Sequence, residues 1–149
     1  MARALSSETL HATSVAISGR AVLLCGPSGA GKSDLALRLI DRGATLVSDD
    51  YTLVKRIDGR LLATAPDTIR GKMEVRGIGV VPMDCVADAP VALLVDLFDR
   101  VDRMPLTPLH RTVAGMDVRV VKIAPFESSA PIKVELALRS FAAEGSARS

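Results

Sequence analysis

Short apolar runs separated by turn-forming residues dominate the sequence, a pattern that predicts strands rather than long helices. Asp58-Gly59 is the sharpest separator, because Asp-Gly favours the tight turn of a β-hairpin. Gly19-Arg20 and Ala114-Gly115 divide apolar runs in the same way. The predicted strands are Leu10–Ile17, Ala21–Cys25, Thr45–Ser48, Tyr51–Ile57, Arg60–Ala65, Val91–Phe98, Arg111–Val113 and Val118–Ile123.

Helical periodicity is confined to two segments of the chain. Leucine and isoleucine recur among good helix formers over Asp34–Asp41, and Gly43 follows as a stop signal. Apolar residues at helical spacing predict a C-terminal helix over Pro131–Ala143, followed by a frayed tail, Glu144–Ser149. Pro66–Arg76 has the composition of a charged loop. The fold class is therefore α/β, β-rich with few helices.

Composition excludes several classes of function. The chain has 149 residues, the length of a single domain. Its 19 basic and 17 acidic residues leave a net charge of +2, which is too balanced for duplex DNA as the main partner. No apolar run reaches the roughly 20 residues of a membrane span, and the first residues lack a signal-peptide pattern. We therefore expect neither nucleic acid nor membrane as a partner.

The two cysteines also indicate the redox environment in which the protein is expected to function. Cys25 and Cys85 lie in apolar surroundings and show no spacing typical of a metal or redox site. Buried, reduced cysteines are the simpler interpretation. We therefore expect a reducing, cytoplasmic environment.

A glycine-rich motif lies between the predicted strand Ala21–Cys25 and the helix that follows, and it fits G-x-x-x-x-G-K-[ST] at every fixed position. Its residues are Gly26, Pro27, Ser28, Gly29, Ala30, Gly31, Lys32 and Ser33. Glycines allow backbone N–H groups to turn toward phosphate oxygens, and the helix N-terminus adds partial positive charge. Lys32 is expected to reach the β- and γ-phosphates, and the Ser33 hydroxyl to bind Mg²⁺. The motif predicts binding of a nucleoside triphosphate or another polyphosphate.

Phosphoryl transfer also needs an acidic residue near the metal, commonly at the end of an apolar strand. Two sites compete for this role. Asp49 and Asp50 end the short strand Thr45–Ser48, where two adjacent carboxylates would raise each other's pKa, as suits a general base. Asp96 ends a longer apolar run and is the better formal match, although a strand-end ion pair would also explain it. The residues alone leave this choice open.

Four further positions are candidates on weaker grounds. Glu74 and Arg76 precede a Gly-Ile-Gly bend and would project from the same side of an extended chain, as a metal ligand and a charge clamp or as a surface ion pair. His11 lies on the strand before the P-loop strand, where a structural histidine is the more common case. Arg103 follows the Asp96 strand and is either a solvated loop charge or a phosphate contact.

Taken together, these motifs resemble the HPr kinase/phosphorylase family, bacterial enzymes that phosphorylate a serine of the phosphocarrier protein HPr. The matching features are His11, Gly26–Ser33, Arg42-Gly43, Asp49-Asp50, Glu74–Val80 and Asp102-Arg103. Their order and spacing agree with the catalytic domain of the family over most of the chain. The E-x-R-G-x-G-[IV] segment is the family's own signature, and its pairing with a P-loop is specific.

The resemblance implies a P-loop catalytic core of the HPr kinase and phosphoenolpyruvate carboxykinase type, as a single domain over residues 1–149. It implies ATP at the P-loop, with Lys32 active on the phosphates and Mg²⁺ held by Ser33 and Glu74. Asp50 would accept the proton of the target serine, which favours it over Asp96. His11 and Arg103 would complete the active site.

The resemblance also names the partner, an HPr-type phosphocarrier protein, which we expect to dock on Pro131–Ala143. Long members of the family carry an N-terminal domain ahead of the histidine segment. Because the sequence begins shortly before His11, we expect this domain to be absent, and the hexameric state of the long members then does not carry over directly. A homo-oligomer is compatible with the resemblance. The segment Ala124–Pro131 lacks the arginine that the family uses in the reverse reaction, which favours the kinase direction. The rival interpretations are a small-molecule kinase, disfavoured because no helical lid follows the P-loop helix, and an ATP-binding regulatory switch.

Overall fold

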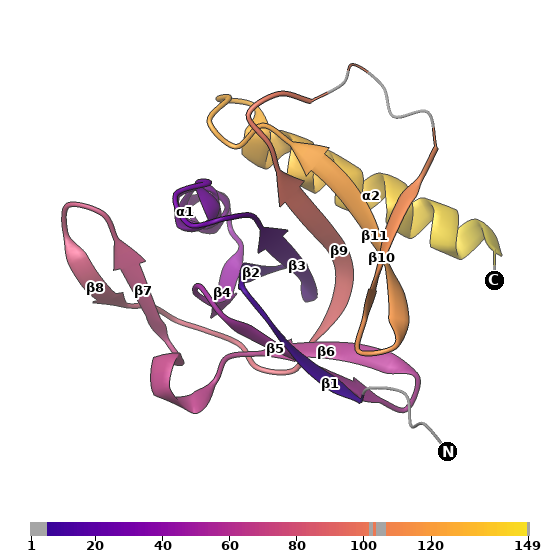
Figure 1. Ribbon diagram of the computed structural model, residues 1–149, viewed down its shortest axis with the longest axis horizontal. Coiled ribbons are helices and arrows are strands. Elements are labelled where there is room, and N and C mark those ends of the chain that lie inside the picture. Colours follow the sequence, from indigo (N-terminus) through magenta and orange to yellow (C-terminus); the bar gives the residue numbers. More distant parts are fainter. Residues whose placement is uncertain (1–5, 102, 104–106, 149) are drawn as a thin grey trace.

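The computed structural model describes residues 6–101, 103 and 107–148, of which residues 142–148 are described by their backbone alone. Within these residues the chain is mostly strand, with α1 (Lys32–Asp41) and α2 (Ala130–Arg148) as its α-helices (Figure 1). The strands are β1 (Ser7–Leu10), β2 (Ala12–Ile17), β3 (Arg20–Cys25), β4 (Thr45–Ser48), β5 (Thr52–Ile57), β6 (Arg60–Thr64), β7 (Lys72–Val75), β8 (Gly79–Pro82), β9 (Ala89–Leu97), β10 (Leu109–Val113) and β11 (Met116–Ile123). The β-rich α/β prediction is confirmed.

The strands other than β7 and β8 join into one bent sheet. Its order is β1-β5-β6-β9-β3-β2-β4, and β11 pairs with the other edge of β9 and with β10. β9 connects the two parts of the sheet, because Ala89 and Pro90 pair with β6 while the later residues pair with β3 and β11. The β1-β5-β6 part therefore lies against one face of the remaining strands, as Figure 1 shows.

Four strands point in the same direction and end at one edge of the sheet. β3, β9 and β11 are parallel neighbours. β4 has the same direction, because β2 is antiparallel to both β3 and β4. In open α/β sheets the loops outside the carboxyl ends of such strands form the ligand site. This edge is therefore where we expect chemistry.

Buried apolar side chains cover both faces of the sheet, in keeping with the alternation of side chains along a strand. Leu23 and Leu94 pack toward the β1-β5-β6 layer. Their neighbours Leu24 and Val95 face the helices, where buried residues of α1 and α2 such as Leu35, Leu39, Val134 and Leu138 cover them. The helices thereby fix the position of the loop between β3 and α1.

The predicted strand Leu10–Ile17 is two strands, because the chain changes layers at His11. β1 pairs with β5 in one layer, and β2 pairs with β3 and β4 in the other. Apolar residues continue on both sides of the break, so the pattern of apolar positions does not indicate it.

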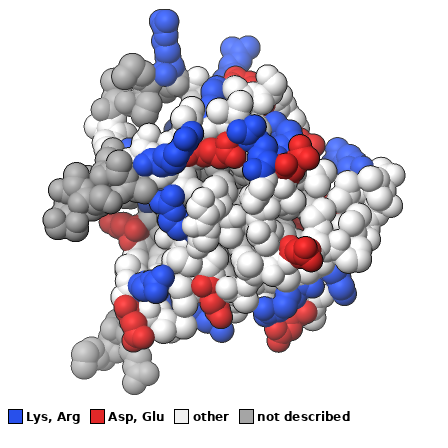
Figure 2. Space-filling model, turned by 180° about the vertical axis from the view of Figure 1, so that it is seen from behind, with Lys and Arg blue, Asp and Glu red and all other residues white. Residues whose placement is uncertain are grey.

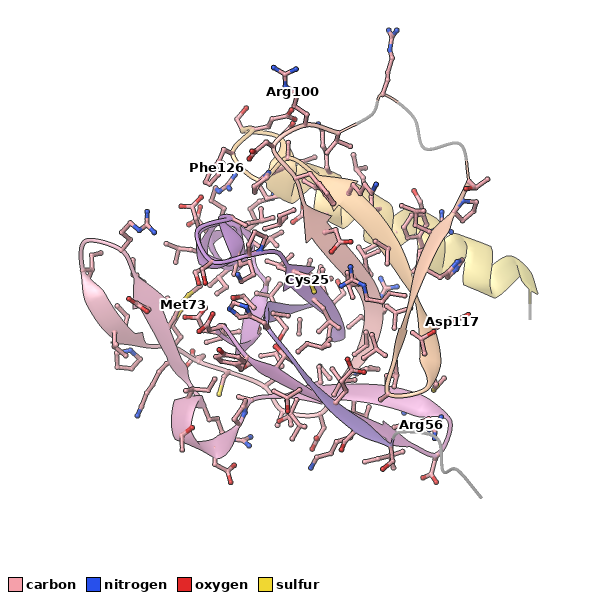
Figure 3. The ribbon with its side chains drawn as sticks, viewed as in Figure 1. Cys25, Arg56, Met73, Arg100, Asp117 and Phe126 are labelled. Atoms are coloured by element: carbon pink, nitrogen blue, oxygen red, sulfur yellow. The ribbon has the colours of Figure 1, made fainter. Side chains whose placement is uncertain are left out.

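The prediction of a loop over Pro66–Arg76 is wrong in its second half. Lys72–Val75 forms β7 and pairs with β8 as a separate two-stranded sheet. Gly77 and Gly79 have φ of 86° and 119°, so they supply the left-handed backbone of the turn. Met73 is buried beneath the hairpin, on the side of β7 that faces α1 (Figure 3).

The remaining predicted elements hold, with shifted boundaries. α1 begins at Lys32 rather than Asp34, because the end of the P-loop is its first turn. Gly43 has a φ of 108° after the helix and confirms the stop signal. The expected frayed tail is wrong up to Arg148, where α2 ends. Residue 149 lies outside the described residues.

The described helices can be compared with the pattern of a membrane helix, and one face of the molecule shows how its charges are distributed. In the part of the chain that the structure describes, no helix is both long and apolar enough to cross a membrane. Figure 2 shows lysine and arginine interspersed with aspartate and glutamate over the described part of that face.

Candidate active site

The P-loop, Gly26–Ser33, follows the carboxyl end of β3 and leads directly into α1, as its sequence predicts. Gly26 has no room for a side chain, since an added Cβ would lie 2.9 Å from the Cβ of Ala30. Gly31, the residue before α1, has a φ of 96°. These positions keep the backbone of the loop tightly turned and close to whatever it surrounds. The loop is therefore shaped as a phosphate cradle.

Lys32 lies along the inside of this loop. Its Nζ donates hydrogen bonds to the carbonyl oxygens of Gly26 at 2.7 Å and Pro27 at 3.0 Å. The residue is 6% exposed. The ammonium group is thus held by the same backbone that would surround the phosphates, and it lines the cavity described below.

Asp49 connects three elements through its buried carboxylate. Ser33 Oγ donates to Asp49 Oδ1 at 2.6 Å, and Thr13 Oγ1 donates to the same oxygen at 3.1 Å. The backbone N–H of Glu74 donates to the other oxygen, Oδ2, at 3.0 Å. The sequence placed Asp49 beside the catalytic candidate but did not reveal that it joins the P-loop, β2 and β7.

Asp50 differs from Asp49 in both backbone and surroundings. Its φ is 69°, a left-handed conformation, and its N–H donates to Thr13 Oγ1 at 3.1 Å. This turn directs the two adjacent carboxylates to different places. The Asp50 side chain is 57% exposed and lines the cavity.

His11 contacts Asp50 across the strand edge. Its Nε2 lies 2.8 Å from Asp50 Oδ1, and a hydrogen bond joins them. The Tyr51 ring stacks on the imidazole, with ring centroids 5.1 Å apart. His11 stands at the start of β2, which runs antiparallel to β3, so the P-loop and the histidine meet at one edge. The break in the strand that the sequence did not predict is what places it there.

A cavity of about 780 Å³ lies between the P-loop and the β7–β8 hairpin. Lys32, Ser33, Asp49, Asp50, Glu74 and Arg76 all line it. The tip of the hairpin, including Ile78, forms the opposite wall. Residues far apart in the sequence are thereby brought to one site, and the predicted group of P-loop, Asp50 and Glu74 is assembled around one space.

The donor set suits a hard cation together with phosphate. The Ser33 hydroxyl and the carboxylates of Asp49, Asp50 and Glu74 provide the oxygen ligands that Mg²⁺ prefers. Among the described residues, however, no three carboxylate, imidazole or thiol side chains approach closely enough to hold a metal on their own.

Asp96, the competing acid, occupies a different environment. Its carboxylate accepts two hydrogen bonds from Arg111, the shorter at 2.8 Å. It is not among the residues that line the cavity. The strand-end ion pair explains this residue.

Arg103 stands apart from the other candidates. It is exposed in the segment that follows β9 and does not line the cavity. Its neighbour in the motif, Asp102, lies outside the described residues. The part that Arg103 plays therefore stays a prediction.

Comparison with known proteins agrees with this geometry. A family model described as the HPr Serine kinase C-terminal domain matches residues 3–144. The HPr kinase/phosphorylase of Alkaliphilus metalliredigens is 37% identical over 147 residues, covering 89% of this chain and 47% of that protein. Its counterpart in Clostridium tetani is 45% identical over 132 residues, covering 80% of this chain and 43% of that protein. The chain thus spans about half the length of these relatives.

A solved structure is also similar. The HPr(Ser) kinase/phosphatase from Coxiella burnetii superimposes with a TM-score of 0.80 and 29% identity, covering 95% of this chain and 94% of that one. The likeness in fold, the P-loop and the family match agree with one another. The chain belongs to the family of the HPr serine kinase C-terminal domain.

Proposed function

We propose that this chain transfers the γ-phosphoryl group of ATP to a serine hydroxyl of an HPr-type phosphocarrier protein. The observation that carries the proposal is the position of Asp50. It is an exposed carboxylate in the same cavity as Lys32 and Ser33 of the P-loop, and it is oriented by His11. A general base must be within reach of the proton that it removes, and this one faces the space that an incoming hydroxyl would enter.

In this proposal the P-loop binds ATP, the phosphoryl donor. Its backbone N–H groups and the start of α1 provide positive potential for the phosphates, and Lys32 adds a full charge at the same place. Bound Mg²⁺ would neutralise charge on the phosphate oxygens, and we assign Ser33 and Glu74 as its protein ligands. Asp49 orients Ser33 and the backbone of Glu74, so it positions both ligands.

In this proposal Asp50 acts on the acceptor, the serine hydroxyl of the HPr-type protein. As the serine oxygen forms its bond to the γ-phosphorus, the bond from that phosphorus to the bridging oxygen of ADP breaks and Asp50 takes the hydroxyl proton. His11 holds the carboxylate through its hydrogen bond at 2.8 Å. Arg103 would stabilise negative charge in the transition state, approaching from the segment after β9. Positioning and electrostatics supply most of the acceleration in such reactions.

The C-terminal helix is our proposed docking site for the acceptor protein. Ile132 and Leu136 are 42% and 50% exposed on α2, one helical turn apart and hence on one face. Arg42, at the end of α1, forms a bidentate pair with Glu135 between them, its Nη2 lying 2.7 Å from Oε1. This pair fixes α2 to the helix that begins in the P-loop.

The setting and direction of the reaction complete the proposal. We propose a cytoplasmic reaction, supported by two cysteines that are both free. We propose the kinase direction, because Ala124–Pro131 contains no arginine. A homo-oligomer is compatible with this scheme.

The direct test is to incubate the chain with ATP, Mg²⁺ and an HPr-type protein and to determine the mass of that protein. We expect one added phosphoryl group on a serine. Release of free phosphate without labelling of the HPr-type protein would instead indicate a nucleotide-dependent switch.

A further inference from the structure

We propose that Phe126 is the platform on which the nucleotide base stacks. This inference rests on the proposed use of ATP and adds the subsite that distinguishes a nucleotide from a bare polyphosphate. Phe126 follows β11 in the segment that leads into α2, and it lines the same cavity as the P-loop. It is 66% exposed, although phenylalanine is among the residue types most often buried.

The ring directly contacts the P-loop. A Cβ added to Gly31 would lie 2.9 Å from Cζ of Phe126, so the ring occupies the space beside the residue that precedes Lys32. Figure 3 shows Phe126 between the segment before α2 and the P-loop end of α1. A nucleotide whose phosphates lie in the P-loop would therefore have an aromatic surface next to it.

The backbone that carries the ring is fixed. Arg38 of α1 donates to the carbonyl oxygen of Pro125 and, at 3.2 Å, to that of Glu127, the residues on either side of Phe126. Lys133 also pairs with the Glu127 carboxylate at 2.6 Å. The platform is thereby bound to the P-loop helix before any ligand arrives, which reduces the ordering cost of binding.

The chemistry of the ring favours a base over a phosphate. An aromatic face carries partial negative charge and has no hydrogen-bond donor, so it does not attract an anion. A nucleobase offers a flat π-surface of its own, and stacking on an aromatic side chain tolerates any base. The subsite therefore selects for a nucleotide and discriminates little between adenine and guanine.

The test compares ATP with inorganic tripolyphosphate, both with Mg²⁺, by isothermal titration calorimetry on the full chain. Phe126→Ala should weaken ATP and GTP binding by about 5- to 100-fold, the range expected for loss of one base–aromatic stack. Its affinity for tripolyphosphate should stay within about twofold of the original, as for a surface substitution. Phe126→Tyr keeps the ring and should retain the affinity for ATP.

Phe98→Ala is the matched control. Phe98 is 44% exposed and follows β9 at the same edge of the sheet, but it is not among the residues that line the cavity. We expect this variant to bind ATP as the unaltered chain does. Thermal unfolding of Phe126→Ala should be unchanged, because its ring is largely exposed. Phe98→Ala also loses the contact of its ring with Lys122, so a small drop in its unfolding temperature would reflect that contact.

The outcomes separate this inference from the proposed function. Unchanged ATP affinity in Phe126→Ala overturns the platform, even if an HPr-type protein is still phosphorylated. An equal loss of affinity for ATP and for tripolyphosphate also overturns the platform, since the ring would then support the conformation of the P-loop and would not contact the base. A selective loss for ATP supports it, whether or not an HPr-type protein is the acceptor. Failure of the unaltered chain to bind either ligand overturns both.

Discussion

The hydroxyl of Ser33 lies 2.6 Å from a carboxylate oxygen of Asp49, so one hydrogen bond joins the last residue of the P-loop to the end of β4. Asp50, the next residue, turns away from this bond through its left-handed backbone and enters the cavity. The adjacent acids therefore have different surroundings, and the proposed function assigns them separate tasks, Asp49 in positioning the metal ligands and Asp50 at the acceptor.

Asp50→Asn should abolish phosphoryl transfer while ATP binding is retained. The amide cannot take the hydroxyl proton, and loss of a general base lowers the rate by about 10²- to 10⁴-fold. Transfer is measured by mass spectrometry and ATP binding by calorimetry. Asp96→Asn is the control, because Asp96 pairs with Arg111 away from the cavity. Equal turnover by the Asp50 variant, or loss of turnover without unfolding in the control, would show that the wrong acid was assigned.

Asp49→Ala should lower the free energy of unfolding by about 1–3 kcal/mol, because it leaves the buried hydroxyl of Thr13 and the partly buried backbone N–H of Glu74 without their acceptor. Urea denaturation measures this change. Asp67→Ala removes a carboxylate that is 97% exposed and paired only with Arg70 in the turn, so its effect should stay within about 0.5 kcal/mol. Similar effects in the two variants would contradict a structural role for Asp49.

His11→Ala should lower kcat by up to about 100-fold, because Asp50 loses the side chain that orients it. The KM for ATP should change little, since His11 is not among the residues that line the cavity. Steady-state kinetics separate the two constants. A variant in which KM rises and kcat is unchanged would place His11 in nucleotide binding instead.

Leu136→Asp should weaken recognition of the HPr-type protein and leave ATP binding unchanged. A charge on the exposed face of α2 would disrupt an apolar contact there, and the residue lies outside the cavity. Leu109→Asp, on the exposed part of β10, is the matched control. The KM for the acceptor protein is the quantity to compare, and a rise of the same size in both variants argues against docking on α2.

Cys25 should resist alkylation in the folded chain, whereas the partly exposed Cys85 reacts first. Burial raises the pKa of the Cys25 thiol from 9.0 to about 11, although Arg111 opposes the shift. Between these values the unfolded chain has lost the proton that the folded chain keeps, so stability falls as the pH rises through this window. Iodoacetamide labelling with peptide mapping gives the order of reaction, and rapid labelling of Cys25 near pH 8 would contradict it.

Local patterns were sufficient for most of the fold and for the P-loop. Hairpins such as β5–β6 follow from Asp58-Gly59 and its flanking alternation, because turn chemistry and pairing are both local. β7 was missed, since Met73 and Val75 lie among charged residues and the pairing with β8 depends on glycines that also suit a loop. The break at His11 was missed because it depends on which layer each strand joins.

The site was predictable where a residue acts in a local motif and not where distant elements meet. Lys32 and Ser33 were evident from the spacing of the P-loop motif, and Asp50 was preferred over Asp96 through the resemblance to the family. The position of Asp49 as a link between elements depends on hydrogen bonds from Thr13 and from a backbone N–H of β7. Neither hydrogen bond can be inferred from a local sequence pattern. No sequence motif indicated a role for Phe126, because the ring reaches Gly31 only through the path of the chain after β11.

The shared direction of β3, β4, β9 and β11 has an evolutionary consequence. The loops that follow these strands lie at one edge of the sheet. The helix α2 packs on the sheet through its buried side, so its exposed side makes no contribution to that packing. Substitutions at exposed α2 positions such as Ile132 and Leu136 can accumulate without disturbing the loops that would hold a nucleotide. A lineage could therefore diverge in its choice of acceptor protein while its energy donor stays the same.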